Sequence, residues 1–184
     1  MVFRMSTKIL AVIHSRPKDA MKNAMTAMNC GCDGVFFISH GDMTPAELLY
    51  LSDSDVFPNP QGVNFLGLSV EEAMNRAGKR ASMIWSDYTP VGAERIAIEA
   101  AKSAMVFDGL FFGGVAFKYQ PQPSDLMQAA KEVRGFVDVL TTSGDGTGIA
   151  PDVAKLAALA EGLRNCTLKS TKIWETLQKS RFPK

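Results

Sequence analysis

The chain has 184 residues, of which 46% are hydrophobic and 21% are charged, and its formal net charge is +1. This composition predicts a globular domain with a large apolar core, and it excludes a disordered tail, a collagen-like repeat and a small disulfide-stapled protein. No apolar run reaches the roughly 18 residues that a membrane-spanning helix needs, so we expect no membrane insertion. Residues 1–7 do not resemble a secretory signal, and we therefore expect a cytoplasmic protein.

Charge and cysteine content narrow the range of partners. Residues 164–184 contain six Lys or Arg and one Glu, a charge of +5 that leaves −4 on the preceding residues. We expect this basic tail to be solvated and expect no nucleic-acid binding, because the rest of the chain offers no basic surface.

Cys30, Cys32 and Cys166 fit neither a zinc ribbon nor a redox C-x-x-C motif, so we interpret them as reduced packing residues.

Short, continuously apolar segments alternate along the chain with segments of helical periodicity. This alternation is typical of an α/β fold with a parallel sheet, whose strands are buried on both faces. The expected strands are residues 8–14, 34–39, 62–68, 81–85, 109–113 and 137–142.

Helices are expected between these strands because the connecting segments have recognisable ends. Thr44 and Ser69 are each followed three residues later by Glu, which is the spacing of an N-terminal capping box. No linker separates the elements, so we predict one domain over residues 1–163, followed by the tail of residues 164–184. The expected helices are residues 18–29, 45–51, 70–77, 92–104, 124–134 and 151–163.

An aspartate recurs close to the start of several strands. Asp33 and Asp108 are 75 residues apart, or three units of 25, and this spacing favours a parallel (β/α) barrel of TIM type over a doubly wound sheet. Asp138 precedes another strand in the same way. Strand N-termini lie on the stability face of such a barrel, so we interpret these aspartates as structural.

The chain supplies six clear βα units, fewer than the eight of a complete TIM barrel. Residues 165–168 and 173–179 are candidates for a seventh strand and helix, although the first segment is too polar for a strand buried on both faces. Two explanations stay open. Either a partner chain completes the barrel, which implies a homo-oligomer, or the chain is shortened or shifted in frame near residue 164, which the change in charge and composition favours.

Polar residues follow the expected strands, and the carboxyl ends of parallel strands form the functional rim of such folds. Both histidines of the chain, His14 and His40, lie there as candidate general acids or bases, with Asp87 as an orienting carboxylate. The alternative for each histidine is a structural hydrogen bond. Together with Asp42 and Asp87 they could ligate a divalent metal, but one histidine per loop gives no ligand spacing, so we assign no metal site.

The strongest local motif is the glycine-rich segment of residues 143–148. Its glycines expose backbone N–H groups, and the expected helix near Pro151 adds a positive dipole end, so the segment predicts a phosphate or carboxylate site. A plain tight turn and a dinucleotide site are the alternatives, but the spacing does not match G-x-G-x-x-G, and we assign no cofactor. The candidate ligand-binding residues are Asn64, Lys118, Ser143, Gly144, Gly146, Thr147 and Gly148.

Several of these segments resemble a known family. Residues 137–148 (VDVLTTSGDGTG), followed by Ala150-Pro151-Asp152, are similar to the "ADAVIVTG…TG…P" segment of the BtpA/SgcQ family of TIM-barrel proteins. Residues 62–66 resemble that family's "GVNVL" strand and residues 33–35 its "DGV" strand start, and the similarity extends over about residues 8–163. The chain departs from the family after His14, where the proline-rich loop is shortened, and beyond Arg164, where the later glycine-rich phosphate segment has no counterpart.

The resemblance implies a TIM barrel more than a reaction, because family members are implicated in photosystem I biogenesis or belong to sugar-metabolism operons. We therefore expect a protein that binds a small phosphorylated or carboxylated metabolite at the rim, with acid/base chemistry by the rim histidines. The alternative is a non-enzymatic assembly or regulatory factor that uses the barrel as a scaffold.

Overall fold

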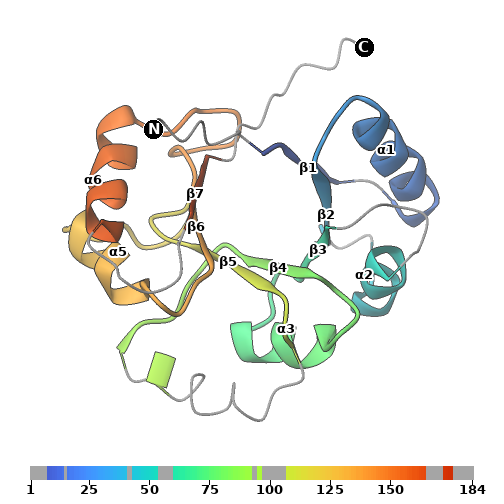
Figure 1. Ribbon diagram of the computed structural model, residues 1–184, viewed down its shortest axis with the longest axis horizontal. Helices are drawn as coiled ribbons and strands as arrows, with labels where there is room; N and C mark the ends of the chain where they lie inside the picture. The colour runs from blue at the N-terminus through green and yellow to red at the C-terminus, as the bar shows by residue number, and fades with distance from the viewer. Residues whose placement is uncertain are drawn as a thin grey trace, which may run out of the picture. The chain divides into compact units, whose positions relative to one another are not determined.

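The structure is a computed structural model of the chain, shown in Figure 1. It describes residues 8–14, 16–40, 43–53, 60–92, 95–96, 107–164 and 172–175. Parallel strands alternate with helices, as the sequence predicted, and the fold class is that of an incomplete TIM-type (β/α) barrel. The chain divides into two compact units: unit 1 is Met1–Ile84 with Val106–Gly109, and unit 2 is Trp85–Met105 with Leu110–Lys184.

Unit 1 is a ladder of parallel strands in chain order. Ile13 pairs with Phe37, Ile38 pairs with Asn64, and the third strand continues the ladder to the fourth. The strands are β1 (Leu10–Ile13), β2 (Gly34–Ile38), β3 (Gln61–Asn64) and β4 (Met83–Ser86), of which Met83 and Ile84 belong to unit 1.

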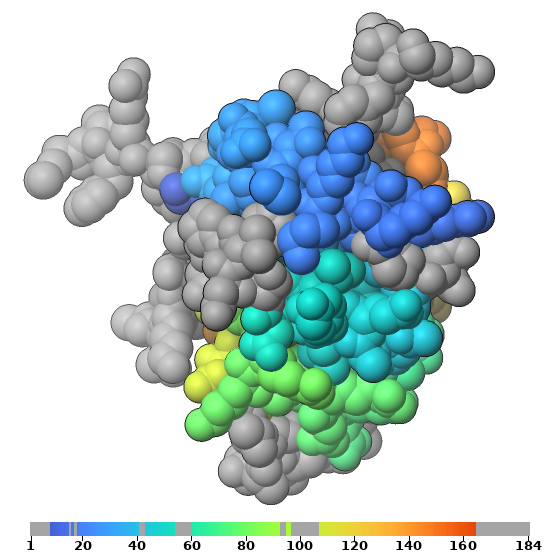
Figure 2. Space-filling view, turned by 90° about the vertical axis from the view of Figure 1, so that its right-hand side faces the viewer, coloured from blue at the N-terminus to red at the C-terminus, as the bar shows by residue number. Residues whose placement is uncertain are grey.

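Three helices accompany these strands: α1 (Pro17–Asn29), α2 (Pro45–Ser52) and α3 (Val70–Ala77). Figure 1 shows α1 beside β1 and β2, and α2 beside β3. Figure 2 shows the outer side of unit 1, on which the colours run from blue through cyan to green in chain order. The core lies between these helices and the strands, where Phe37, Val63 and Ile84 are fully buried. Burial of each such side chain contributes roughly 1.5–3 kcal/mol.

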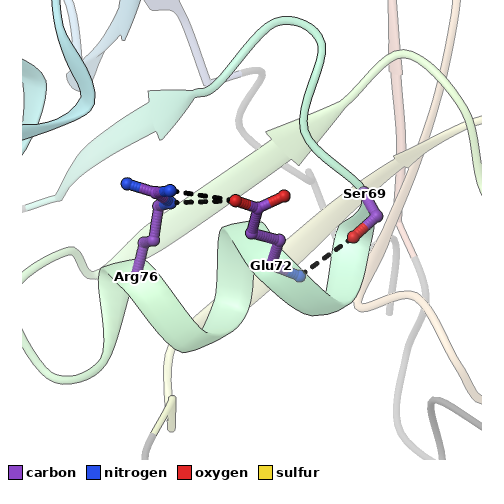
Figure 3. Close-up of polar contacts among 3 residues, drawn as sticks. All are labelled: Ser69, Glu72 and Arg76. Carbon is purple, nitrogen blue, oxygen red and sulfur yellow. Dashed lines mark hydrogen bonds and ion pairs between the residues drawn. The ribbon is translucent and has the colours of Figure 1, made fainter.

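Local sequence signals set the helix starts. Thr44 forms a complete capping box with Glu47, as predicted. At α3 the Ser69 Oγ accepts a hydrogen bond from the Glu72 N at 3.1 Å, but the Glu72 carboxylate accepts from Arg76 instead of closing the predicted box (Figure 3). The Glu72 carboxylate therefore forms an i,i+4 ion pair with Arg76 on the surface of α3.

Unit 2 repeats the parallel arrangement. Its strands β5 (Leu110–Gly114), β6 (Val139–Thr142) and β7 (Lys172–Glu175) pair in chain order. Its helices α5 (Leu126–Val133) and α6 (Val153–Leu163) lie side by side in Figure 1. Between β4 and β5, residues 92, 95 and 96 are helical, and the rest of the helix predicted over residues 92–104 lies outside the described residues.

Two of the three aspartates noted in the sequence, Asp33 and Asp138, connect a strand to the one that precedes it in the chain. Asp33 Oδ2 accepts a hydrogen bond from Ile9 N at 2.9 Å, and Asp33 N donates to Ile9 O at 2.7 Å. Asp138 Oδ2 accepts from Phe111 N at 2.9 Å, and Asp138 N donates to Phe111 O at 2.9 Å. Both side chains satisfy backbone groups at the start of a neighbouring strand, so their structural interpretation is confirmed.

Ser82 makes the same connection before β4. Its Oγ accepts from Gln61 N at 2.9 Å, and its own N donates to Gln61 O at 3.2 Å. Ser82 was not predicted to make this contact, because the sequence repeat is an aspartate and Ser82 carries a hydroxyl in its place.

Two predicted elements need correction. The strand predicted over residues 62–68 ends at Asn64, because Leu66 and Gly67 form a turn in which Gly67 has a φ of 86°. The helix predicted from residue 173 is wrong, since Lys172–Glu175 form a strand parallel to β6, while residues 165–168 lie outside the described residues.

The cysteine interpretation also needs correction. Cys30 and Cys32 are free, but Cys30 is exposed and is therefore not a packing residue. Burial, followed by the charges of Cys30 and Asp33, raises the pKa of the Cys32 thiol, which makes it a weaker nucleophile at neutral pH. Cys166 lies outside the described residues.

Candidate functional site

The two histidines come together at the carboxyl ends of β1 and β2. His14 directly follows β1, and His40 lies two residues after the end of β2. Because these strands are paired in parallel, the two loops leave the sheet side by side, and the imidazole rings stack with centroids 4.6 Å apart and an interplanar angle of 23°. Both side chains are exposed. We call these two residues the histidine pair.

Asn64 is the last residue of the neighbouring strand β3. It pairs in register with Ile38, and its backbone O accepts a hydrogen bond from Ser39 N at 3.3 Å. The residue is 2% exposed, so Asn64 is part of the buried end of unit 1. Asp42, considered as a metal ligand, lies outside the described residues.

Asp87 follows β4 and belongs to unit 2. Its backbone packs against Gly114 at the end of β5, where an added Cβ would lie 2.2 Å from Asp87 O. The absence of a side chain at residue 114 therefore allows the backbone of Asp87 to approach the strand. The Asp87 carboxylate is half-buried.

The loops after β5 and β6 meet through polar side chains. Lys118 Nζ donates to Thr147 Oγ1 at 3.1 Å, and the Tyr119 hydroxyl lies 3.5 Å from the same oxygen. The backbone of the first loop is held as well, because Lys118 N donates to Ser143 Oγ at 2.7 Å. We call Lys118, Tyr119, Ser143 and Thr147 the loop cluster. Three of its four members were predicted ligand-binding residues.

The hydrogen bond of Tyr119 has an electrostatic consequence. The Thr147 side chain, with a smaller contribution from the Lys118 charge, lowers the pKa of the Tyr119 phenol. Lys118 Nζ also lies 5.9 Å from the centroid of the Tyr119 ring. The Lys118 ammonium therefore contacts both the Thr147 hydroxyl and the face of the Tyr119 ring.

Lys155, in the first turn of α6, connects the same two loops. Its ammonium donates to Ser143 O at 2.8 Å and also to Ala116 O. Desolvation lowers the pKa of this lysine, while the charge of Asp145 acts in the opposite direction. Lys155 was not predicted as a site residue, because a single lysine within a Leu/Ala-rich helix has the sequence pattern of a solvated side chain.

The loop after β5 contains two non-glycine residues in the left-handed backbone region, Ala116 with a φ of 51° and Tyr119 with a φ of 64°. Such conformations cost on the order of 1 kcal/mol or more and persist where the surroundings enforce them. Here the enforcing contacts are the hydrogen bonds from Lys155 to Ala116 O and from Lys118 N to Ser143 Oγ. The loop is therefore held in a conformation that its own residues do not favour.

The glycine-rich segment is folded tightly on itself. A Cβ on Gly144 would lie 2.2 Å from Ile149 O, and Ile149 N donates to Gly146 O in a turn. Gly148 has a φ of 80°, which glycine adopts readily. The segment thus has the features of the tight-turn alternative, and it presents Thr147 to the loop cluster.

The start of α6 differs from the expected anion site. The N-cap is Asp152, whose carboxylate accepts a hydrogen bond from Ala154 N at 2.7 Å. A carboxylate of the chain itself therefore occupies the positive end of the helix dipole. An external anion at this helix end would therefore lie beside the Asp152 carboxylate, and the anion site near Pro151 stays a prediction.

One further feature lies outside these clusters. An open depression beside α3 is lined by Ser69, Glu71, Glu72, Asn75 and Arg76, none of which was a predicted site residue. Within the part of the chain that the structure describes, no group of three or more His, Cys, Asp or Glu residues is arranged to hold a metal ion. Over the same residues, no helix has the length and apolar character needed to cross a membrane.

Comparison of the chain with protein-family models, with curated proteins and with solved structures gave no match in any of the three. The TIM-type fold class therefore rests on the structure itself.

Proposed function

We propose that the loop cluster of unit 2 binds a small metabolite through a phosphate or carboxylate group. The observation that carries this proposal is the convergence of the Lys118 ammonium and the Tyr119 hydroxyl on Thr147 Oγ1, at the carboxyl ends of neighbouring parallel strands. An ammonium and two hydroxyls are donors that suit anionic oxygens, and charge-assisted hydrogen bonds of this kind are the stronger ones.

The rigidity of the two loops favours binding. Lys118 and Lys155 contribute two positive charges there, against the carboxylates of Asp125, Asp145 and Asp152, so the Lys118 ammonium and not the net charge would attract an anion. The backbone of both loops is held by cross-loop hydrogen bonds. A held arrangement loses little conformational entropy when a ligand binds, which favours affinity.

The experiment measures binding of inorganic phosphate and of acetate to the full chain by calorimetry at low ionic strength. We expect Lys118→Met to weaken phosphate binding about tenfold or more, because it removes the cation while keeping the length of the side chain. The matched control is Lys79→Met, which makes the same change in net charge at an exposed residue of unit 1. Equal affinities of the two variants would contradict the proposal.

We also propose that the chain is a relative of the BtpA/SgcQ family, on the strength of the resemblance of residues 137–152 and 62–66 to segments of that family. The fold class is compatible with this proposal but is shared by many unrelated proteins. Acid/base chemistry by His14, His40 or Asp87 stays a prediction from the sequence. A folded variant with His14→Ala and His40→Ala should lose turnover if the protein is an enzyme, and should keep partner binding if it is a scaffold.

A further inference from the structure

Exposed apolar side chains lie at the loop cluster. Tyr119, a member of the cluster, is 79% exposed, and Ile149, two residues after Thr147, is 60% exposed. The Ile149 side chain folds back over the glycine-rich segment, because its Cδ1 lies 3.3 Å from the position that a Cβ on Gly146 would take. The Tyr119 hydroxyl lies 3.5 Å from Thr147 Oγ1. Both apolar side chains therefore belong to the immediate surroundings of Thr147.

The Tyr119 ring is exposed although its loop is anchored. Two residues earlier, the Phe117 ring is buried and packs edge-on against Trp85, with ring centroids 5.7 Å apart. Phe117 O accepts hydrogen bonds from Gln120 N at 3.2 Å and from Gln122 Nε2 at 2.9 Å. These contacts fix the backbone from which the Tyr119 ring projects, at a φ of 64°. Strained backbone of this kind is concentrated at ligand contacts and switch regions, and an exposed aromatic ring on it is suited to contact a ligand.

The cation and the aromatic ring are close enough to contact one ligand. Lys118 Nζ lies 5.9 Å from the centroid of the Tyr119 ring and 3.1 Å from Thr147 Oγ1. Packed aromatic rings have centroids about 4.5–7 Å apart. A ligand whose ring is joined directly to an anionic group can therefore place the anion against Lys118 and Thr147 while its ring covers Tyr119. Ile149 adds an apolar contact, and sites in which a few polar groups orient an apolar body are typical of small-molecule binding.

We propose that the ligand of the loop cluster is an aromatic phosphate or carboxylate, whose anionic group contacts Lys118 and Thr147 and whose ring packs on Tyr119 and Ile149. This inference rests on the proposed function and specifies its ligand class. The ring adds to the affinity because its contact with two exposed apolar side chains removes apolar surface from water. An anion without a ring meets the same ammonium but gains nothing from this contact.

The test compares methyl phosphate with phenyl phosphate, two monoesters of similar charge that differ in their apolar group. Acetate and benzoate form a second pair, which distinguishes a carboxylate site from a phosphate site. Calorimetry with the full chain at low ionic strength should show the aromatic member of the binding pair about tenfold tighter. Equal affinities within that pair would overturn this inference and leave the proposed function standing. Binding in neither pair would overturn both.

An alkyl ester distinguishes ring packing from simple apolar burial. Butyl phosphate buries an apolar chain but has no aromatic face for the Tyr119 ring. It should therefore bind more tightly than methyl phosphate and less tightly than phenyl phosphate. Butyl phosphate as tight as phenyl phosphate would overturn the aromatic ligand class.

A substitution at Ile149 tests the apolar contact, and the measured quantity is the ratio of the affinities for phenyl phosphate and methyl phosphate. Ile149→Ser should lower this ratio about threefold or more. The matched control is Ile9→Ser, the same change at an isoleucine of unit 1 that is 59% exposed, and it should keep the ratio of the natural chain. A general disturbance of the loop weakens both esters equally, so an unchanged ratio in Ile149→Ser would count against the proposal.

Two substitutions at Tyr119 test the ring itself. Tyr119→Phe and Tyr119→Leu both remove the hydroxyl, but the first keeps the aromatic face. Tyr119→Phe should keep the preference for phenyl phosphate, and Tyr119→Leu should lose most of it, with circular dichroism as the check that each variant folds. Equal preferences in the two variants would overturn the proposal. In the natural chain, nuclear Overhauser effects should connect the phenyl protons with the Ile149 methyl groups, and effects to other isoleucines alone would contradict the proposed position of the ring.

Discussion

Lys155 shows how a single residue can be placed against its local preference. A cation in the first turn of a helix lies at the positive end of the helix dipole, which is unfavourable by a few tenths of a kcal/mol or more. The ammonium is retained there by its hydrogen bonds to Ala116 O and Ser143 O, which connect the loops after β5 and β6. Its role is therefore positioning of the loop cluster.

Lys155→Met should lower the free energy of unfolding by about 1–3 kcal/mol, because it leaves two carbonyl groups of the loops without their charged donor. It should also weaken phosphate binding, since the strained backbone of the loop after β5 loses a contact that holds it. Urea unfolding and calorimetry measure the two effects. Lys131→Met, at an exposed residue of α5, is the control and should change both by much less.

Asp33 predicts a dependence of stability on pH. Hydrogen bonds from Lys8 and then from Ile9 N lower the pKa of its carboxyl below the ordinary value of 3.8. The ionised form is therefore favoured in the folded state, and its contribution is complete above pH 3.8 and is lost as the pH falls through the folded-state pKa.

Asp33→Asn should accordingly reduce stability at neutral pH, and the difference from the natural chain should shrink as the solution is acidified below pH 3.8. Asparagine keeps an acceptor for Ile9 N, so the comparison reports the charge. Urea unfolding between neutral and acid pH measures it. In a Lys8→Met background the effect of Asp33→Asn should be smaller, and an undiminished effect would contradict the proposed ion pair.

At the scale of elements, the helix ends follow from local chemistry. Helix α3 begins after Ser69 as predicted, because the serine hydroxyl accepts the Glu72 N–H that the first turn leaves unpaired. The role of the Glu72 carboxylate was predicted incorrectly, since Arg76 one turn later competes for it (Figure 3). Capping hydroxyls are local signals, whereas side-chain pairing on the helix surface depends on which of several partners is within reach.

Ser69→Ala should destabilise the chain by about 1 kcal/mol, because it removes the N-cap acceptor. Ser69→Asp should keep most of the stability, since a carboxylate caps the same N–H and interacts favourably with the helix dipole. Thermal and urea unfolding of the two variants measure the difference. Equal destabilisation by both changes would show that the hydroxyl does not cap α3.

The strands illustrate the limit of sequence patterns at this scale. The six expected strands are present, but their ends are shifted. A continuous apolar run does not define the residues at which hydrogen bonding to the neighbouring strand begins and ends. Strand β7 was predicted as helix beyond residue 172, since Lys172–Glu175 has neither a long apolar run nor a turn signal. Its pairing with β6 is a tertiary interaction that a four-residue segment does not reveal by itself.

At the scale of the whole molecule, ligand binding is coupled to stability. A ligand that binds the folded chain and not the unfolded chain raises the unfolding temperature by mass action. Phosphate should therefore raise the midpoint of thermal unfolding of the natural chain, and the rise should grow with phosphate concentration. The same additions should leave Lys118→Met nearly unchanged, after correction with sodium chloride at equal ionic strength. A rise of equal size in both would indicate a general salt effect.

Homo-oligomerisation stays a prediction at this scale. The described residues provide seven strands, each parallel to its paired neighbours within its unit, whereas a complete TIM barrel has eight. Sedimentation velocity over a range of protein concentrations measures the association state directly. A single monomeric species at all concentrations would contradict the prediction.

Up to residue 163, the sequence by itself determined the order of the described strands and helices, most helix ends to within two residues, and the identity of most polar residues after the strands, because these depend on the periodicity and chemistry of neighbouring residues. Tertiary structure alone decided that His14 and His40 stack, that Lys155 joins two loops, and that Asp152 occupies the helix end expected to hold an anion. The first two contacts exist because parallel pairing of neighbouring strands brings their loops side by side. The third exists because the Asp152 carboxylate accepts the hydrogen bond of the Ala154 N–H group. Distances of that kind are set by the packing of the folded chain and have no counterpart in residue order.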